Sequence, residues 1–156
     1  MTSLDFNIKD IKDFNFYFKR AKSEAKLCYD TPSTRKGRTW EKVKEAYFQG
    51  HPPEVYLIEN FNYTDDTRKF KDVFNTRGEP VEIKTAEKES NVKYKLDELA
   101  DIKNDPKQAY RNIPNIVYMW LVDVKTADYK YYGKYEWSIN AFFNNGSFKQ
   151  TSTENL

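Results

Sequence analysis

Apolar residues recur at helical spacing over much of the chain. Within residues 4–28 they are separated by three or four positions: Ile8, Ile11, Phe14, Phe18, Ala21 and Ala25. This spacing predicts one or two amphipathic helices. Thr39 is a suitable N-cap for a further helix over residues 40–49, which Gly50 would end. Another helix is predicted over residues 92–103, where Asn104-Asp105-Pro106 breaks the pattern.

Other segments have the composition of strands. Residues 54–62 follow a rigid, non-helical connection at His51-Pro52-Pro53 and are predicted to be extended. Residues 69–74 and 79–85 are predicted to form the two arms of a hairpin. Residues 116–124 are β-branched and aromatic on both faces, which indicates a central strand. In the strand predicted after a turn at residues 125–128, alternation places four aromatic side chains on one face: Tyr129, Tyr131, Tyr135 and Trp137.

These elements predict an α/β (α+β) fold in which helices flank a mixed central β-sheet. We expect one domain over residues 1–156. It would have a helical part at 4–50, a sheet core at 54–140 and a frayed polar tail at 149–156. The chain's 156 residues suit a single core, and they include twelve Tyr, eleven Phe and three Trp.

Composition removes several kinds of chemistry. A single cysteine, Cys28, excludes an internal disulfide, and with His51 as the lone histidine no His/Cys zinc site can form. The first residues lack a basic segment followed by an apolar stretch, so we expect no signal peptide, no membrane span and a cytoplasmic location. The net charge of +2, from 26 basic and 24 acidic residues, does not by itself indicate nucleic-acid binding.

The hairpin at residues 72–84 carries the most specific pattern. If Thr76-Arg77-Gly78 forms a three-residue loop with Gly78 in the left-handed conformation, paired residue numbers sum to 154. Asp72 then lies opposite Glu82. Because side chains alternate along a strand, Lys84 shares their face while Val73, Val81 and Ile83 face the other way.

Two carboxylates held opposite each other, with Cβ atoms about 5 Å apart, repel unless a cation lies between them. Mg²⁺ prefers such hard oxygen ligands and keeps its other positions for water and substrate phosphate. Lys84, about 6–7 Å along the strand from Glu82, would contact the scissile phosphate and orient a metal-bound water. Asp72, Glu82 and Lys84 together are therefore candidates for a phosphodiester-hydrolysis site. In the ordinary interpretation, lysines simply neutralise an exposed acidic face.

Aspartate, nine intervening residues, glutamate, an apolar residue and lysine on a hairpin resemble the PD-(D/E)xK nuclease superfamily. Residues 72–84 are most similar to the active-site hairpin of PvuII-type type II restriction endonucleases, and the similarity extends over roughly residues 70–140. The resemblance implies a restriction-endonuclease-like fold and a homodimer that cuts a palindromic DNA duplex. It implies Asp72, Glu82 and the Ile83 carbonyl as Mg²⁺ ligands, and Lys84 as the catalytic lysine. Lys71 stands where the superfamily has proline.

Other acidic residues are open alternatives. Some superfamily members add a glutamate from the preceding helix, for which Glu41 and Glu45 are candidates. Asp65 and Asp66 compete with Asp72 for its role. Helix-surface ion pairs for the glutamates and a solvated loop for the aspartates are the ordinary interpretations.

Residues after the catalytic strand are candidates for DNA contacts. Side chains able to reach bases or phosphates are Lys88, Asn91, Lys93, Tyr94, Arg111, Lys130 and Lys134. Around Phe14, Phe16, Tyr17 and Phe18 the first helix has more apolar residues than one buried stripe needs, which suggests a dimer interface.

The sequence thus predicts a Mg²⁺-dependent endonuclease acting on double-stranded DNA. Two alternatives remain open: a structure-specific nuclease, such as a junction resolvase or a phage or repair nuclease, and a non-catalytic module that binds nucleic acid or protein through its tyrosine-rich sheet.

Overall fold

Two parallel strands, β4 (Pro80–Ala86) and β5 (Ile116–Asp123), form the centre of the sheet in the computed structural model, which describes residues 3–65 and 73–156. They are connected by helix α5 (Ser90–Asn104) and the 3₁₀ helix η2 (Pro106–Arg111). β5 is the predicted central strand. Its side chains from Ile116 to Trp120 are buried, as expected for a strand covered on both faces.

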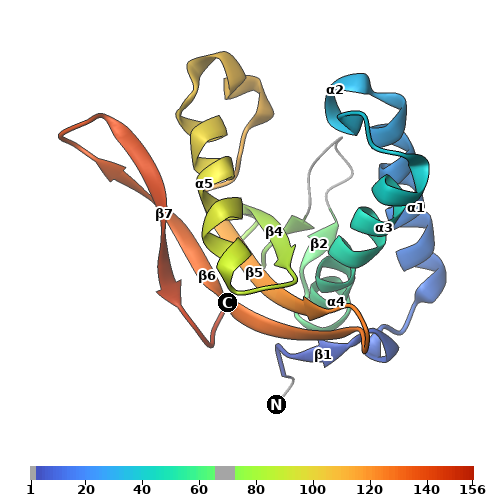
Figure 1. Ribbon diagram of the computed structural model, residues 1–156. Helices are drawn as coiled ribbons and strands as arrows, with labels where there is room; N and C mark the ends of the chain where they lie inside the picture. Colours follow the sequence, from blue (N-terminus) through green and yellow to red (C-terminus); the bar gives the residue numbers. More distant parts are fainter. Residues whose placement is uncertain (1–2, 66–72) are drawn as a thin grey trace.

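Antiparallel strands extend the sheet on both sides. Within the described residues, a seven-stranded sheet has the order β1-β6-β5-β4-β3-β2, and β7 also pairs with β6. The outer strands are β1 (Phe6–Asn7), β2 (Thr64–Asp65), β3 (Val73–Phe74), β6 (Asp128–Asn140) and β7 (Asn145–Ser152). The sheet is therefore mixed and flanked by helices, which confirms the predicted α+β fold class (Figure 1).

The remaining helices belong to the N-terminal part of the chain. They are η1 (Ile8–Asp10), α1 (Phe14–Asp30), α2 (Pro32–Arg35), α3 (Trp40–Gly50) and α4 (Pro52–Asn60). Of the expected elements, α3 begins after Thr39, whose side chain accepts a hydrogen bond from the Lys42 amide as an N-cap does. No helix of the described residues is long and apolar enough to span a bilayer.

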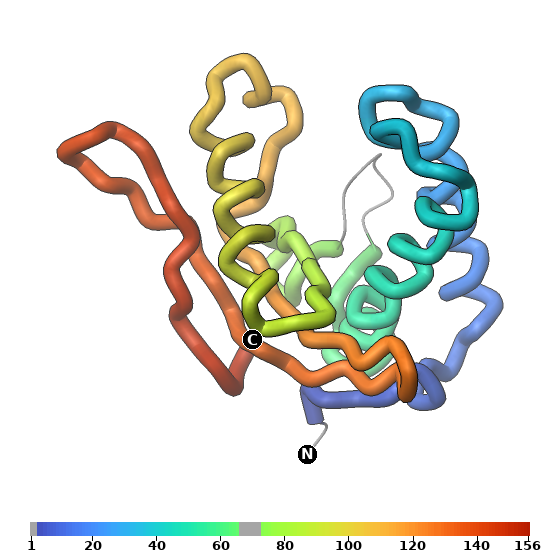
Figure 2. Tube along the Cα trace, viewed as in Figure 1, coloured from blue at the N-terminus to red at the C-terminus, as the bar shows by residue number. Residues whose placement is uncertain are grey.

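The two faces of the sheet have different cores. On one face, α1 and α4 pack against residues such as Val81, Ile83 and Trp120. On the other, apolar side chains of α5 cover Val117 and Met119. The tube in Figure 2 shows α5 and the group α1–α3 rising from the sheet as two separate arms. We call the second surface, which carries Val117 and Met119, the α5 face.

Three predicted elements are wrong, each for a physical reason. Residues 52–60 form helix α4, not a connection and a strand. Pro52 and Pro53 occupy its first turn, where the missing amide hydrogens cost nothing. A short apolar run fits a buried helix as well as a strand. Residues 6–7 form β1, so the N-terminal helix begins only at Phe14.

The predicted frayed polar tail is the third element that is wrong. Residues 145–152 form β7, in which Phe148 is buried against the α5 face. Beyond it, the Tyr131 hydroxyl donates to the Asn155 carbonyl and the Tyr118 hydroxyl to the Leu156 carbonyl. A strand held by backbone pairing needs few apolar side chains of its own, so its composition does not reveal it.

The predicted alternation of β6 holds only as far as Tyr131. Trp120 pairs with Tyr131 but Met119 pairs with Gly133, which leaves Tyr132 as an extra residue in a β-bulge. The bulge transfers the odd-numbered residues to the other face. Tyr129 and Tyr131 join the core under α1 and α4, whereas Tyr135 joins the core under α5.

The hairpin between β3 and β4 has the predicted register. Val73 lies opposite Val81, the Asn75 amide donates to the Glu79 carbonyl at 2.9 Å, and Gly78 has a φ of +76°. Buried Asn75 holds the loop, because its side-chain oxygen accepts from the backbone amides of Arg77 and Glu79 at 3.0 and 2.9 Å. The sequence therefore determines this turn locally.

Substitutions at two glycines should have opposite effects. Gly78→Ala is expected to lower the free energy of unfolding by about 1–2 kcal/mol, because an L side chain is strained at this positive φ although no atom lies within 4 Å of the added Cβ. Gly50→Ala, in the last turn of α3 with equally open space, should raise it by up to about 1 kcal/mol. Urea denaturation measures both, and a Gly78→Ala variant as stable as the parent would contradict the expectation.

Candidate active site at strand β4

Glu82 and Lys84 project from the same side of β4. The Lys84 Nζ lies 3.4 Å from Glu82 Oε1. The Lys84 side chain is 36 % exposed and the Glu82 side chain is 15 % exposed. Ile83, between them, points into the core under α1 and α4. This is the predicted alternation, with an acid and a lysine on one face and apolar residues behind them.

The pair lies on the α5 face. Parallel pairing sets Glu82 beside Val117 and Lys84 beside Met119, and both neighbours belong to the core that α5 covers. The Glu82 side chain is more enclosed than that of Lys84, which reaches further into solvent.

Asp72, the third member of the predicted site, lies outside the described residues, as does Asp66. The described part of the hairpin ends at Val73, whose pairing with Val81 follows the register that the sequence predicts. Among the residues that the structure describes, no group of three or more His, Cys, Asp or Glu side chains could hold a metal ion. The oxygen donors there are the Glu82 carboxylate and the Ile83 carbonyl. Both are hard ligands of the kind that Mg²⁺ prefers, and Mg²⁺ commonly takes only one or two protein carboxylates.

Lys95 is a member of this region that the sequence analysis missed. Burial on α5 lowers the pKa of Lys95, and the nearby positive charge of Lys84 lowers it further. The ammonium groups of Lys84 and Lys95 thus lie close enough to interact. The helical position of Lys95, between the buried Val92 and Leu99, was the available signal.

Asp65 is not an alternative to Asp72. It pairs with Val73 across β2 and β3, so it shares the face of the core under α1 and α4. There its Oδ1 lies 2.9 Å from the Arg20 guanidinium. This carboxylate is on the opposite side of the sheet from Glu82.

Arg20 is the centre of a buried charged network. It lies 2.8 Å from Glu54 and 2.9 Å from His51 Nδ1, and His51 Nε2 lies 2.9 Å from Glu24. Burial alone would lower the pKa of Arg20, but the surrounding carboxylates, Glu54 first, outweigh burial and raise that pKa. Through these contacts the network connects α1, α4 and β2. It therefore fixes the positions of these three elements relative to one another.

The candidate glutamates of α3 make contacts within their own helix. Lys44 Nζ lies 3.3 Å from Glu41 Oε2, and the Gln49 amide donates to Glu45 Oε1 at 3.3 Å. Both glutamates are exposed, and α3 itself contacts β4. Within the described part of the chain, neither carboxylate belongs to a group of three or more side chains that could hold a metal ion.

The residues predicted to contact DNA lie in different parts of the structure. Lys88, Asn91, Lys93 and Tyr94 are exposed at the start of α5, and Tyr94 is 68 % exposed. Arg111 is exposed at the end of η2, where it donates to Gln108. Lys134 is the exception. It pairs with Tyr118 and therefore lies on the opposite face of the sheet from Glu82.

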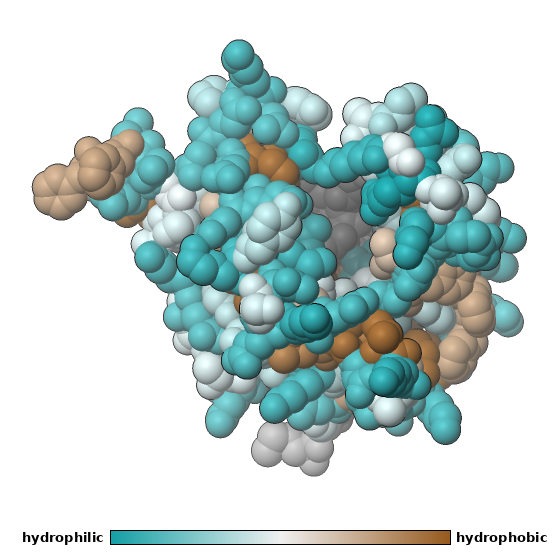
Figure 3. Space-filling model, viewed as in Figure 1, coloured by the Kyte–Doolittle hydropathy of each residue, from teal (hydrophilic) through white to brown (hydrophobic). Residues whose placement is uncertain are grey.

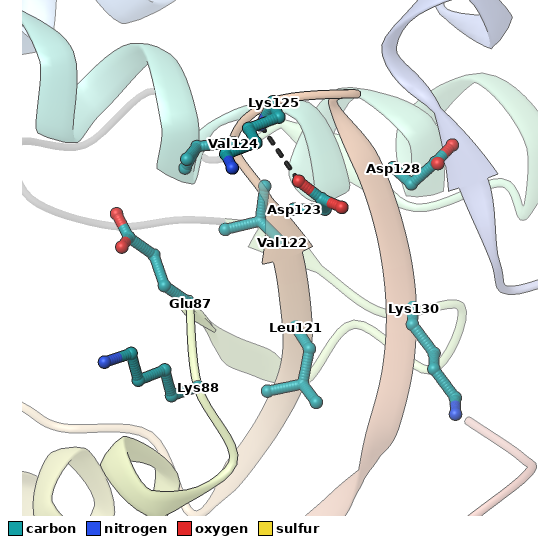
Figure 4. Close-up of a pocket in the computed structure, with 9 residues that line it drawn as sticks. All are labelled: Glu87, Lys88, Leu121, Val122, Asp123, Val124, Lys125, Asp128 and Lys130. Atoms are coloured by element: carbon teal, nitrogen blue, oxygen red, sulfur yellow. Dashed lines mark hydrogen bonds between the residues drawn. The ribbon is translucent and has the colours of Figure 1, made fainter.

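Lys88 lines a hollow that is separate from the candidate site. The hollow is formed by the end of β5, the start of β6 and the residues after β4, and Figure 4 shows Glu87, Lys88 and Lys130 around Leu121. Its charged side chains are mixed in sign: Glu87, Lys88, Asp123, Lys125, Asp128 and Lys130. Neither Glu82 nor Lys84 lines it. A hollow with balanced charge has no preference for an anionic ligand.

The expected dimer surface on the first helix is partly in the core. Tyr17 is 5 % exposed and donates to the Phe48 carbonyl, whereas Phe14 and Phe18 are 38 % and 49 % exposed. The remaining apolar surface is therefore smaller than the sequence suggests.

Comparisons with known proteins add no family to this description. No protein-family model matches the chain, and neither the curated proteins nor the solved structures include a significant match.

Removing Arg20 should destabilise the protein strongly. In Arg20→Ala, Glu54 loses a partner while it stays buried, which costs about 3–5 kcal/mol of unfolding free energy. Lys19→Ala, an exposed neighbour on the same helix, should change stability by no more than about 0.5 kcal/mol. Chemical denaturation of both variants provides the test, and equal stabilities would show that the network is energetically unimportant.

Replacing Lys84 should change the titration of Lys95. Because like charges disfavour ionisation, Lys84→Ala is expected to raise the pKa of Lys95, while burial still keeps that pKa below its ordinary value. Lys93→Ala, at an exposed position paired with Asp97, should leave it unchanged. NMR titration of the lysine Cε resonances measures the shift, and a Lys95 pKa insensitive to Lys84 would place the two ammonium groups apart.

Proposed function

We propose that the protein is a Mg²⁺-dependent endodeoxyribonuclease that hydrolyses phosphodiester bonds of double-stranded DNA, of the type II restriction class. The observation that carries the proposal is the placement of Glu82 and Lys84, 3.4 Å apart on one face of β4 and backed by buried Val81 and Ile83. Glu82 and Lys84 lie on the strand that follows the tight β3–β4 turn. They are the members of the 72–84 pattern whose positions the structure describes.

The residues have separate roles in this proposal. Asp72, Glu82 and the Ile83 carbonyl would hold Mg²⁺, which when bound supplies a Lewis acid and lowers the pKa of a water molecule. Lys84 orients the attacking water and compensates the charge that develops on the phosphate. Lys95, on α5, adds a second positive charge near Lys84. A phosphate dianion or diester would be attracted to this paired arrangement of ammonium groups.

The arrangement of the helices supports a large polymeric substrate. Strand β4 contacts both α5 and α3, which belong to the two arms, and the space-filling view in Figure 3 shows the outline indented between the arms. Most of the visible surface around the indentation is hydrophilic. A nuclease acting on a duplex needs a wide, polar approach of this kind, rather than an enclosed apolar pocket.

The test is cleavage of supercoiled plasmid in the presence of Mg²⁺. Discrete products are expected from the unmodified protein, and sequencing of their ends would give the recognition site. Lys84→Ala and Glu82→Gln should each reduce the cleavage rate by about 100-fold or more, since each removes an electrostatic contribution to the transition state. Asp72→Asn should do the same.

A matched control is available on β6. Glu136 also lies near a lysine two positions away, with Lys134 Nζ at 4.0 Å, but the lysine of that pair faces the opposite side of the sheet from Glu82. Glu136→Gln should therefore retain full activity. Activity that survives Lys84→Ala would overturn the site, cutting confined to branched DNA would indicate a structure-specific nuclease, and absence of cleavage would favour a binding module.

A further inference from the structure

The tip of the β6–β7 hairpin is strongly apolar and fully displayed to solvent. Phe142 is 96 % exposed, Phe143 76 % and Ile139 62 %. In Figure 1 this hairpin projects from the body of the protein, and in Figure 3 its tip forms a brown patch at the left edge. Adjacent large apolar residues exposed to this degree favour aggregation, so folding stability does not explain them.

The hairpin is attached to α5 close to its turn. The Asn104 side chain, at the end of α5, donates to the Gly146 carbonyl at 2.9 Å and accepts from the Gly146 amide at 2.8 Å. Trp137 packs so closely over Gly146 that a Cβ at this position would clash with the ring. The pair Trp137–Phe148 then joins the hairpin to the core under α5. The two phenylalanines are therefore carried on a fixed arm.

The tip also has a defined conformation. The Phe142 amide donates to the Asn140 side chain at 3.0 Å, the Phe143 amide donates to the Asn140 carbonyl at 3.3 Å, and Asn144 has a positive φ of 49°. Asn140 and Asn145 form the last backbone pair before the turn. An ordered turn of this kind keeps both aromatic rings outside the body of the protein.

The charge pattern of the arm suits a polyanion. From Trp137 to Thr153 the chain contains no aspartate or glutamate, although 24 acidic residues occur in the whole sequence. The arm instead carries Lys149 and several amide side chains: Asn140, Asn144, Asn145 and Gln150. Amide side chains can hydrogen-bond to base edges and sugars, and none of them repels phosphate.

The apolar area is too small for a protein interface of ordinary size. The two rings together offer on the order of 350 Å², whereas a stable interface buries about 800 Å² per partner. One or two apolar side chains are, however, what a wedge between neighbouring base pairs requires.

We propose that the β6–β7 arm contacts duplex DNA and inserts Phe142 or Phe143 between two base pairs. The arm and the Glu82–Lys84 pair belong to the same α5 face, because Glu82, Val117 and Tyr135 lie in one row across β4, β5 and β6. This inference rests on the proposed function, in that it takes DNA as the ligand. It adds a mode of binding that needs no catalysis.

The experiment measures binding without cleavage. Duplexes with 2-aminopurine at successive positions are titrated with the full chain in Ca²⁺, and insertion is read from the rise in fluorescence as the probe unstacks. The Phe142→Ser/Phe143→Ser double variant should lose the rise and bind about tenfold more weakly. Val124→Ser, at a half-exposed apolar position outside the arm, is the control and should behave as the parent protein.

The outcomes separate this proposal from the nuclease assignment. Unstacking that depends on the two phenylalanines supports the wedge even if the plasmid is never cut. Unchanged fluorescence in the double variant overturns the wedge, even if Lys84→Ala abolishes cleavage. A double variant that differs only in sedimentation, or only in flotation with anionic vesicles, would likewise overturn it and assign the tip to self-association or to a lipid surface. Circular dichroism melting should show that the variant remains folded, because neither ring is part of a core.

Discussion

The pairing of β4 with β5 is the constraint on which the rest of the structure depends. Six residue pairs hold these strands parallel, and they determine which β4 side chains face each core. A shift of one residue would turn Glu82 and Lys84 towards α1 and α4, and would expose Val81 and Ile83. The burial of the two apolar residues therefore keeps the charged pair at the surface of the sheet. In this sense the core beneath the candidate site stabilises its geometry.

A buried charged network fixes the geometry of the elements on the other side of the sheet. Arg20, His51 and Glu54 are all buried, and their contacts reach Asp65 at the end of β2. Buried ion pairs contribute little net stability compared with apolar packing, but they penalise any arrangement that separates the partners. The network is thus better explained by the fixed geometry it imposes on α1, α4 and β2 than by the energy it supplies.

The elements that the sequence predicted correctly are those determined by neighbouring residues. The β3–β4 turn depends on Asn75 and Gly78, and α3 depends on its Thr39 cap. The errors arose where distant contacts decide. The apolar run after His51 becomes a helix against the sheet, and the polar residues after Phe148 become a strand because β6 supplies partners for their backbone.

In the candidate site, too, features determined by neighbouring residues were predictable and features that depend on distant contacts were not. The shared face of Glu82 and Lys84 follows from strand alternation and was predictable. Lys95 was not, because its nearness to Lys84 depends on how α5 packs on the sheet. Nor was the orientation of Lys134, which requires the pairing of β6 with β5 to be known.

The bulge at Tyr132 and Gly133 has a consequence for function as well as for prediction. Without it, Tyr135 and Trp137 would continue on the face of Tyr129 and Tyr131, under α1 and α4. With it, Trp137 lies beside α5, where Lys103 Nζ is 5.3 Å from its ring and Asn104 holds Gly146. One extra residue in β6 therefore directs the apolar arm to the face that carries Glu82 and Lys84. A single long strand can in this way contribute to the hydrophobic core at its start and present an exposed aromatic tip near its end.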